Sequence, residues 1–132
     1  MNETQPSVEA QIRGLKMVLA FYVCYGFYCG CLGLLVGAFS GGGVLIGAVA
    51  HLMIAFVSGA IYAGMDMPTR RLHTICVVWQ LLILGLAIWM VSGIMRDDFV
   101  LGLVLATALI PIPLCSTWVL LQSPVRRYFG VP

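Results

Sequence analysis

The chain contains very few charged residues for its length. Seven of the 132 residues are Lys or Arg and five are Asp or Glu, so 9% are charged, whereas 61% are hydrophobic. A soluble domain carries about 25% charged residues, which means that this chain could not cover a water-facing surface in the usual way. The mean hydropathy of +1.04 agrees. The scarcity of charge excludes an ordinary soluble domain and indicates that lipid is the solvent.

The sequence also lacks the residue patterns of many membrane enzymes. It has five cysteines but no CxxC pair. Cys24 and Cys31 share a helical face, yet two turns separate them by about 10 Å, too far for one metal ion. No HExxH or GxSxG motif occurs, and no apolar run contains paired carboxylates. We therefore expect no catalytic residues, no metal and no cofactor, and we predict that the chain is not an enzyme. The small net charge of +2 predicts no nucleic-acid partner.

Long apolar runs are what the sequence does contain. Four runs lack Asp, Glu, Lys and Arg, and each has about the 20 residues that a membrane-crossing helix needs: residues 17–39, 43–63, 73–95 and 99–121. Because the runs are continuous rather than alternating, they exclude transmembrane β-strands.

The linkers between these runs are too short to fold, and short linkers place consecutive helices antiparallel. We predict an all-α integral membrane protein, a four-transmembrane-helix up-down antiparallel bundle. It forms a single membrane domain over residues 1–132, with a lead-in helix at 1–16 and a cytoplasmic tail at 122–132.

The basic residues lie mostly on one side of the predicted bundle. Only Arg96 falls between the third and fourth runs, on the opposite side. Short cytoplasmic loops are enriched in Lys and Arg, so we predict that both termini are cytoplasmic. Small size and short loops favour a bacterial inner (plasma) membrane. The predicted anchors at the lipid interface are Arg13, Lys16, Arg70, Arg71, Arg126 and Arg127.

Glycines form one face of the first apolar run. Gly26, Gly30, Gly33 and Gly37 follow one another at spacings of 4, 3 and 4, so they lie within about 60° of one another on a helix. In lipid, close backbone approach is what favours helix association. The next run begins with a further GxxxG pattern, Gly43 and Gly47. We predict that the glycine face receives the second helix, and the alternative is a seam between two copies of the chain.

His51 is an ionisable side chain deep inside the second apolar run. It lies about 12 Å from the outer end of that run, near the middle of the bilayer, where such a group is by default a functional candidate. Three interpretations remain open: a neutral imidazole bonded to a neighbouring helix, part of a proton or solute path, or a metal or haem ligand. His73 lies too close to the cytoplasmic end to be the second ligand of a haem.

Two prolines interrupt the fourth apolar run. Pro111 and Pro113 should kink or break that helix and free the carbonyls around Thr107 and Leu109. Thr107, Ser116 and Thr117 are nearby hydroxyls that could help to satisfy those carbonyls. If the second and fourth helices touch, the candidate midplane polar site consists of His51, Thr107, Pro111 and Pro113.

Two further polar or proline positions predict helix ends. Asp98 should cap the start of the fourth helix, and Pro124 should end that helix.

Short loops, small-residue seams and the lack of site chemistry favour an accessory or structural subunit. Such a protein acts through helix–helix contacts in the lipid bilayer, with other membrane protein subunits or by self-association. The alternative is a small oligomeric transporter or channel that uses the midplane site around His51, Pro111 and Pro113.

Overall fold

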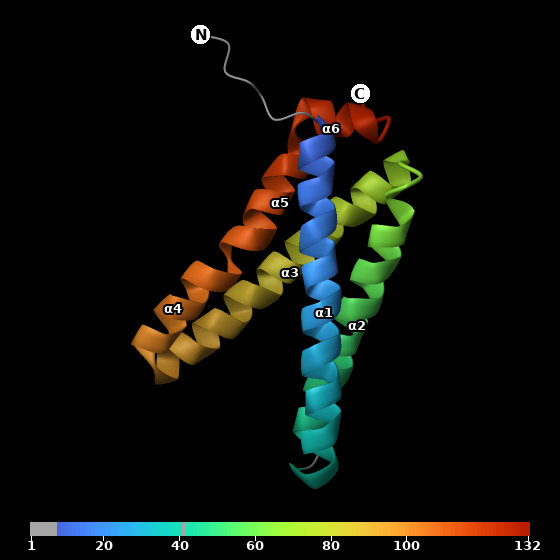
Figure 1. Ribbon diagram of the computed structural model, residues 1–132. Coiled ribbons are helices and arrows are strands. Elements are labelled where there is room, and N and C mark those ends of the chain that lie inside the picture. The colour runs from blue at the N-terminus through green and yellow to red at the C-terminus, as the bar shows by residue number, and fades with distance from the viewer. Residues whose placement is uncertain (1–7, 41) are drawn as a thin grey trace. The chain divides into compact units, whose positions relative to one another are not determined.

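The chain is helical throughout nearly all of its described length. The computed structural model describes residues 8–40 and 42–132, and no strand occurs among them. Four segments are long and apolar enough to cross a membrane, which confirms an all-helical protein with four such segments (Figure 1). The helices are α1 (Val8–Ser40), α2 (Gly42–Gly64), α3 (Arg70–Asp97), α4 (Phe99–Leu109), α5 (Pro111–Leu121) and α6 (Ser123–Tyr128).

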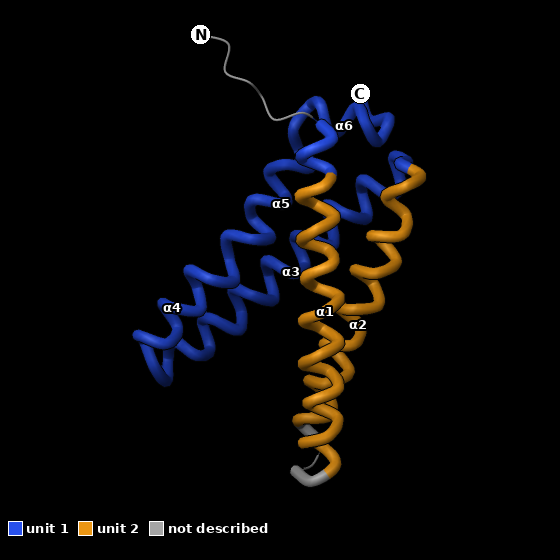
Figure 2. The backbone as a smooth tube through the Cα atoms, in the orientation of Figure 1, with its two compact units in different colours: residues 1–12, 68–132 blue, residues 13–67 orange. Residues whose placement is uncertain are grey.

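The helices divide into two compact units (Figure 2). Unit 2 comprises residues 13–67, that is α1 from Arg13 onward together with α2. The described part of unit 1 comprises residues 8–12 and 68–132, that is the first turn of α1 together with α3 to α6.

The first helix is longer than its apolar run. α1 has 33 residues, which corresponds to about 50 Å at 1.5 Å per residue, whereas the hydrocarbon layer is about 30 Å thick. The described part of the predicted lead-in is therefore continuous with the first membrane segment, and Arg13 and Lys16 belong to the same helix as the apolar residues. The rest of the lead-in, residues 1–7, lies outside the described residues.

Within unit 2, α1 and α2 pack side by side in opposite directions. Gly26 approaches Ala55, and Gly37 approaches Leu45, so residue numbers rise along one helix as they fall along the other.

Within unit 1, polar caps set the starts of two long helices. The Thr69 side chain accepts a hydrogen bond from the Leu72 N–H at 3.1 Å at the start of α3. Asp98 does the same for the Leu101 N–H at 3.0 Å at the start of α4, which confirms the predicted cap. α3 packs against both α4 and α5. Its buried residues are His73, Cys76, Gln80, Ala87 and Val91.

The prolines separate α4 from α5 without a large change in backbone angles. Ile110 joins the two helices with φ −75° and ψ −40°, and its N–H still donates to the Ala106 oxygen at 3.2 Å. The interruption arises because Pro111 and Pro113 have no N–H to donate.

The chain turns after α5. α5 ends at Leu121, and Gln122 is extended with φ −66° and ψ 139°, in agreement with the helix end predicted from Pro124. The predicted tail at 122–132 contains a further helix, α6, which runs across the end of α5 in Figure 1.

Candidate functional site

The glycine face of α1 lies directly against α2 in unit 2. A Cβ added to Gly26 would lie 2.6 Å from the His51 carbonyl oxygen and 2.9 Å from the Ala55 nitrogen. One added to Gly33 would lie 2.9 Å from the Ala48 Cβ. Ordinary carbon contacts begin at about 3.4 Å, so a side chain at either position would force the helices apart. We call Gly26, Gly30, Gly33 and Gly37 the glycine seam.

The remaining seam glycines meet leucine side chains. A Cβ on Gly30 would lie 2.6 Å from Leu52 Cγ, and a Cβ on Gly37 would lie 2.8 Å from Leu45 Cδ2. α2 therefore meets the seam with residues spaced 3, 4 and 3 apart: Leu45, Ala48, Leu52 and Ala55. Gly47, in the second apolar run, makes no such close approach. A Cβ on Gly47 would meet nothing within 4 Å, and Gly43 lies outside the residues whose surroundings are described.

Lys16, near the start of α1, and Asp66, just after the end of α2, form an ion pair at the end of the hairpin away from Gly37. Lys16 Nζ lies 2.5 Å from Asp66 Oδ1 and 5.7 Å from the centre of the Tyr62 ring. The Lys16 and Asp66 side chains are 27% and 72% exposed, so the pair contributes at most about 1 kcal/mol in water. The sequence suggested only a lipid anchor at Lys16, whereas the structure gives it a partner, Asp66, in the turn that follows α2.

His51 bonds to its own helix rather than to a neighbouring one. Its Nδ1 lies 2.8 Å from the Gly47 carbonyl oxygen. A carbonyl can only accept, so Nδ1 carries a proton and donates. The imidazole also lies beside the Tyr25 ring, with 5.9 Å between ring centres. Among the described residues His51 thus forms no hydrogen bond to a neighbouring helix, and its other two interpretations stay predictions.

The predicted midplane site is divided between the two units. His51 belongs to unit 2, whereas Thr107, Pro111 and Pro113 belong to unit 1, so the assembled site stays a prediction. Pro113 is buried, and Thr107 and Pro111 are exposed.

The hydroxyls of Thr107, Ser116 and Thr117 each bond to a carbonyl of their own helix. Thr107 Oγ1 donates to the Val104 oxygen at 2.8 Å. Ser116 and Thr117 each donate to the carbonyl four residues earlier, also at 2.8 Å. These three hydroxyls therefore do not help to satisfy the Thr107 and Leu109 carbonyls, because a hydroxyl in a helix reaches the carbonyl one turn before it.

Titratable and thiol groups are scattered among the described residues. No group of three or more His, Cys, Asp or Glu side chains there could hold a metal ion. The five cysteines are free, with Cys76 buried and Cys24 and Cys115 exposed.

His73 has a role that sequence reasoning missed. Pro124 lies four residues after Leu120 and has no N–H, so the Leu120 carbonyl lacks its usual helical donor. His73 Nε2, on α3, lies 2.9 Å from that oxygen and donates in its place. The Phe129 ring packs on the imidazole, with 5.5 Å between ring centres. Pro124 indicates that the Leu120 carbonyl lacks a backbone hydrogen bond, but nothing in the sequence shows which side chain donates to it.

Further contacts hold α6 against the start of α3, and we call this arrangement the C-terminal clasp (His73, Leu120 and residues 123–130). Val125 and Phe129 lie one turn apart and are 0% and 1% exposed. Arg70 Nε donates to the Gly130 oxygen. Gly130 has φ +70°, the left-handed conformation in which glycine commonly ends a helix.

The first turn of α1 meets the same region of unit 1. Gln11 Nε2 donates to Gln122 Oε1 at 2.7 Å.

The arginines of unit 1 differ in what they bind. Arg126 Nη2 donates to the Pro132 oxygen, and Arg70 is held by Gly130 as described above. Arg71 and Arg127 are exposed, and neither guanidinium forms a hydrogen bond or ion pair with another described residue.

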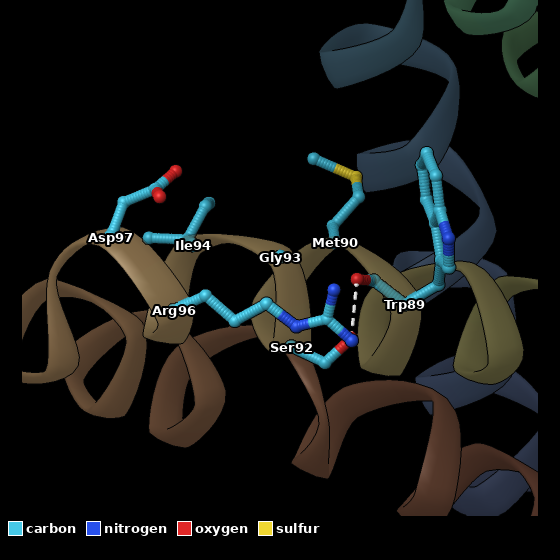
Figure 3. Close-up of a pocket in the computed structure, with 7 residues that line it drawn as sticks. All are labelled: Trp89, Met90, Ser92, Gly93, Ile94, Arg96 and Asp97. Atoms are coloured by element: carbon cyan, nitrogen blue, oxygen red, sulfur yellow. Dashed lines mark hydrogen bonds between the residues drawn. The ribbon is translucent and has the colours of Figure 1, made fainter.

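An open hollow of ≈ 450 Å³ follows the last turns of α3 (Figure 3). Ser92 Oγ donates to the Trp89 oxygen at 2.8 Å, and the Arg96 side chain lies back along the helix toward Ser92, whereas Asp97 points away. The hollow is a groove on one helix, because its lining residues all belong to α3: Trp89, Met90, Ser92, Gly93, Ile94, Arg96 and Asp97.

The same tight backbone approach as in the glycine seam occurs once more in unit 1, at a position the sequence did not single out. A Cβ on Gly102 would lie 2.8 Å from Met95 Cα and 2.9 Å from the Met95 nitrogen.

Comparison of the chain with protein-family models, with curated protein sequences and with solved structures gives no match.

Proposed function

We propose that the chain is an accessory or structural subunit that acts through helix–helix contacts with another membrane protein. In this proposal it crosses a bacterial inner membrane four times in up-down order, with a bend at Pro111 and Pro113. Both termini then lie on the cytoplasmic side, with the arginines of unit 1 other than Arg96. Four helices of sufficient apolar length support the crossings.

The main support for this proposal is that the glycine seam of α1 packs against α2. The most specialised feature of the sequence serves close contact between two helices. The polar groups that a solute path would need are instead engaged locally, since His51, Ser116 and Thr117 each bond to a carbonyl of their own helix. These residues therefore favour a role in helix–helix contact over catalysis or solute transport.

The seam also limits how a partner can bind. Because α2 fills the glycine face of α1, this face is not offered to a second copy, and the partner must use other surfaces. α3 presents one such surface, on which Val78, Leu82 and Trp89 are 50%, 59% and 72% exposed.

Photo-crosslinking in intact membranes tests the subunit role. A benzoylphenylalanine at exposed Trp89 should give one crosslinked species heavier than the chain by the mass of a distinct membrane protein. The matched control places the same residue at Val91, which is 4% exposed and should give no such species. An adduct of twice the chain mass would show self-association instead. Absence of any protein adduct at Trp89 would contradict the subunit role.

The transporter alternative is supported by one observation. His51 Nδ1 is bonded, and its Nε2 has no hydrogen-bond partner among the residues that the structure describes, so that nitrogen is open to a proton. His51→Ala should abolish flux into reconstituted vesicles if the alternative holds, whereas His51→Ala should leave crosslinking at Trp89 unchanged if the subunit role holds.

A further inference from the structure

The C-terminal clasp brings two unpartnered arginines to one end of unit 1. Arg70 donates to the Gly130 oxygen, and the Gly130 N–H donates to the Arg127 oxygen at 2.9 Å. These two bonds fix the segment that bears Arg127 beside the start of α3, where Arg71 follows Arg70. Arg71 and Arg127 are both exposed, and neither guanidinium has a partner among the described residues.

The charge at this end is one-sided. Unit 1 contains four arginines here, at positions 70, 71, 126 and 127, and its described carboxylates are Glu9, Asp97 and Asp98. Asp97 and Asp98 follow the opposite end of α3, and Glu9 has a contact of its own. None of these three acidic side chains contacts Arg71 or Arg127.

α6 has the form of a helix that lies on a membrane surface. Val125 and Phe129 are buried within unit 1, whereas Arg127, on the opposite side of the helix, and Tyr128 are exposed. Pro124 and the extended Gln122 turn α6 across the end of α5 (Figure 1). If α4 and α5 together cross the bilayer, α6 lies along the interface, where Tyr and Arg are favoured.

We propose that Arg71 and Arg127 together bind the phosphate of an anionic phospholipid headgroup, with phosphatidylglycerol as the simplest example. A guanidinium matches phosphate oxygens in geometry and charge, and Lys or Arg residues next to the cytoplasmic end of a membrane helix attract anionic headgroups. The lipid site goes beyond the subunit role and rests only on the membrane location, so that either can fail without the other.

Native mass spectrometry of the detergent-solubilised full chain, titrated with phosphatidylglycerol, measures the affinity of the first bound lipid. Removal of one arginine near the membrane surface should weaken it about fivefold, which corresponds to about 1 kcal/mol. Arg71→Gln combined with Arg127→Gln should therefore weaken it by an order of magnitude or more. The pair Arg71→Lys and Arg127→Lys keeps both charges and should retain most of the affinity.

Three comparisons complete the experiment. Arg96→Gln removes the same charge from the other end of α3 and should leave the first affinity unchanged. Zwitterionic phosphatidylcholine should bind at least fivefold more weakly than phosphatidylglycerol, and inorganic phosphate at millimolar concentration should not displace the lipid. Equal binding of both lipids, equal loss in Arg96→Gln, or unchanged binding in the double Gln variant would overturn the assignment. Full displacement by phosphate would mean that the pair is a free-phosphate site.

Discussion

A single methyl group at Gly26 should weaken the pairing of α1 with α2. An alanine Cβ there would lie 2.6 Å from the His51 carbonyl oxygen and 2.9 Å from the Ala55 nitrogen. Both are backbone atoms and cannot rotate away, unlike the Leu52 side chain opposite Gly30. An ordinary contact begins at about 3.4 Å, so the helices must separate by 3.4 − 2.6, or about 0.8 Å.

The size of the effect follows from that separation. A gap of about 0.5–1 Å loses a quarter to a half of the dispersion energy of each contact, and overpacking of this kind costs about 1–3 kcal/mol. Alanine also favours a helix over glycine by about 0.5–1 kcal/mol. Gly47→Ala gains the same preference without a collision, because nothing lies within 4 Å of a Cβ there. The difference between the two variants therefore isolates the collision and should be about 1–3 kcal/mol.

The assay must report on unit 2, and the three tryptophans all lie in unit 1. Met17 and Met67 flank the Lys16–Asp66 pair and are 68% and 80% exposed. Dyes on cysteines at these two positions, in a chain whose native cysteines are replaced by alanine, report hairpin opening by energy transfer during an SDS titration in mild detergent. Gly26→Ala should open at a lower SDS fraction than Gly47→Ala. Equal midpoints, or a higher midpoint for Gly26→Ala, would refute the seam as a tight backbone contact.

Two further predictions concern unit 1, and both can be followed by tryptophan fluorescence during an SDS titration. His73→Ala should cost about 1–3 kcal/mol, because the Leu120 carbonyl is left without a donor. The same substitution should cost less when Pro124→Ala restores a backbone N–H, and strictly additive losses would contradict this explanation. Gly102→Ala should lower stability by about 1–3 kcal/mol through collision with the Met95 backbone, whereas alanine at one of the open glycines of α3 should not.

The long helices could be predicted because apolar length is a local property of the sequence. The glycine face of α1 could also be located, since 100° per residue fixes which positions share a side. The α2 residues that meet it could not, because the choice between Gly47 and Ala48 depends on how the two helices are rotated against each other. The GxxxG pattern predicted that Gly43 and Gly47 would contact α1, whereas in the structure Ala48 and Ala55 lie opposite the seam glycines.

The C-terminal clasp was harder to predict for a different reason. A hydrogen bond from His73 to Leu120 joins residues 47 positions apart, and local pattern carries no information about such a pairing. α6 was missed because its six residues are too few for a periodic signal, and its stability comes from burial of Val125 and Phe129. The sequence could not show which carbonyls the hydroxyls near Pro113 bind, because the need to satisfy buried backbone groups does not specify the donor.

The antiparallel seam restricts how the chain length can vary. Gly26 pairs with Ala55, Gly33 with Ala48 and Gly37 with Leu45, so one residue inserted between the first and last of these would turn the later glycines by about 100° and expose them to acyl chains. An insertion of seven residues returns to nearly the same side. Homologous chains should therefore tolerate insertions more readily at residues 67–68, between the Lys16–Asp66 pair and the Thr69 cap, than within the seam, where only insertions of about seven residues keep the glycines on one side.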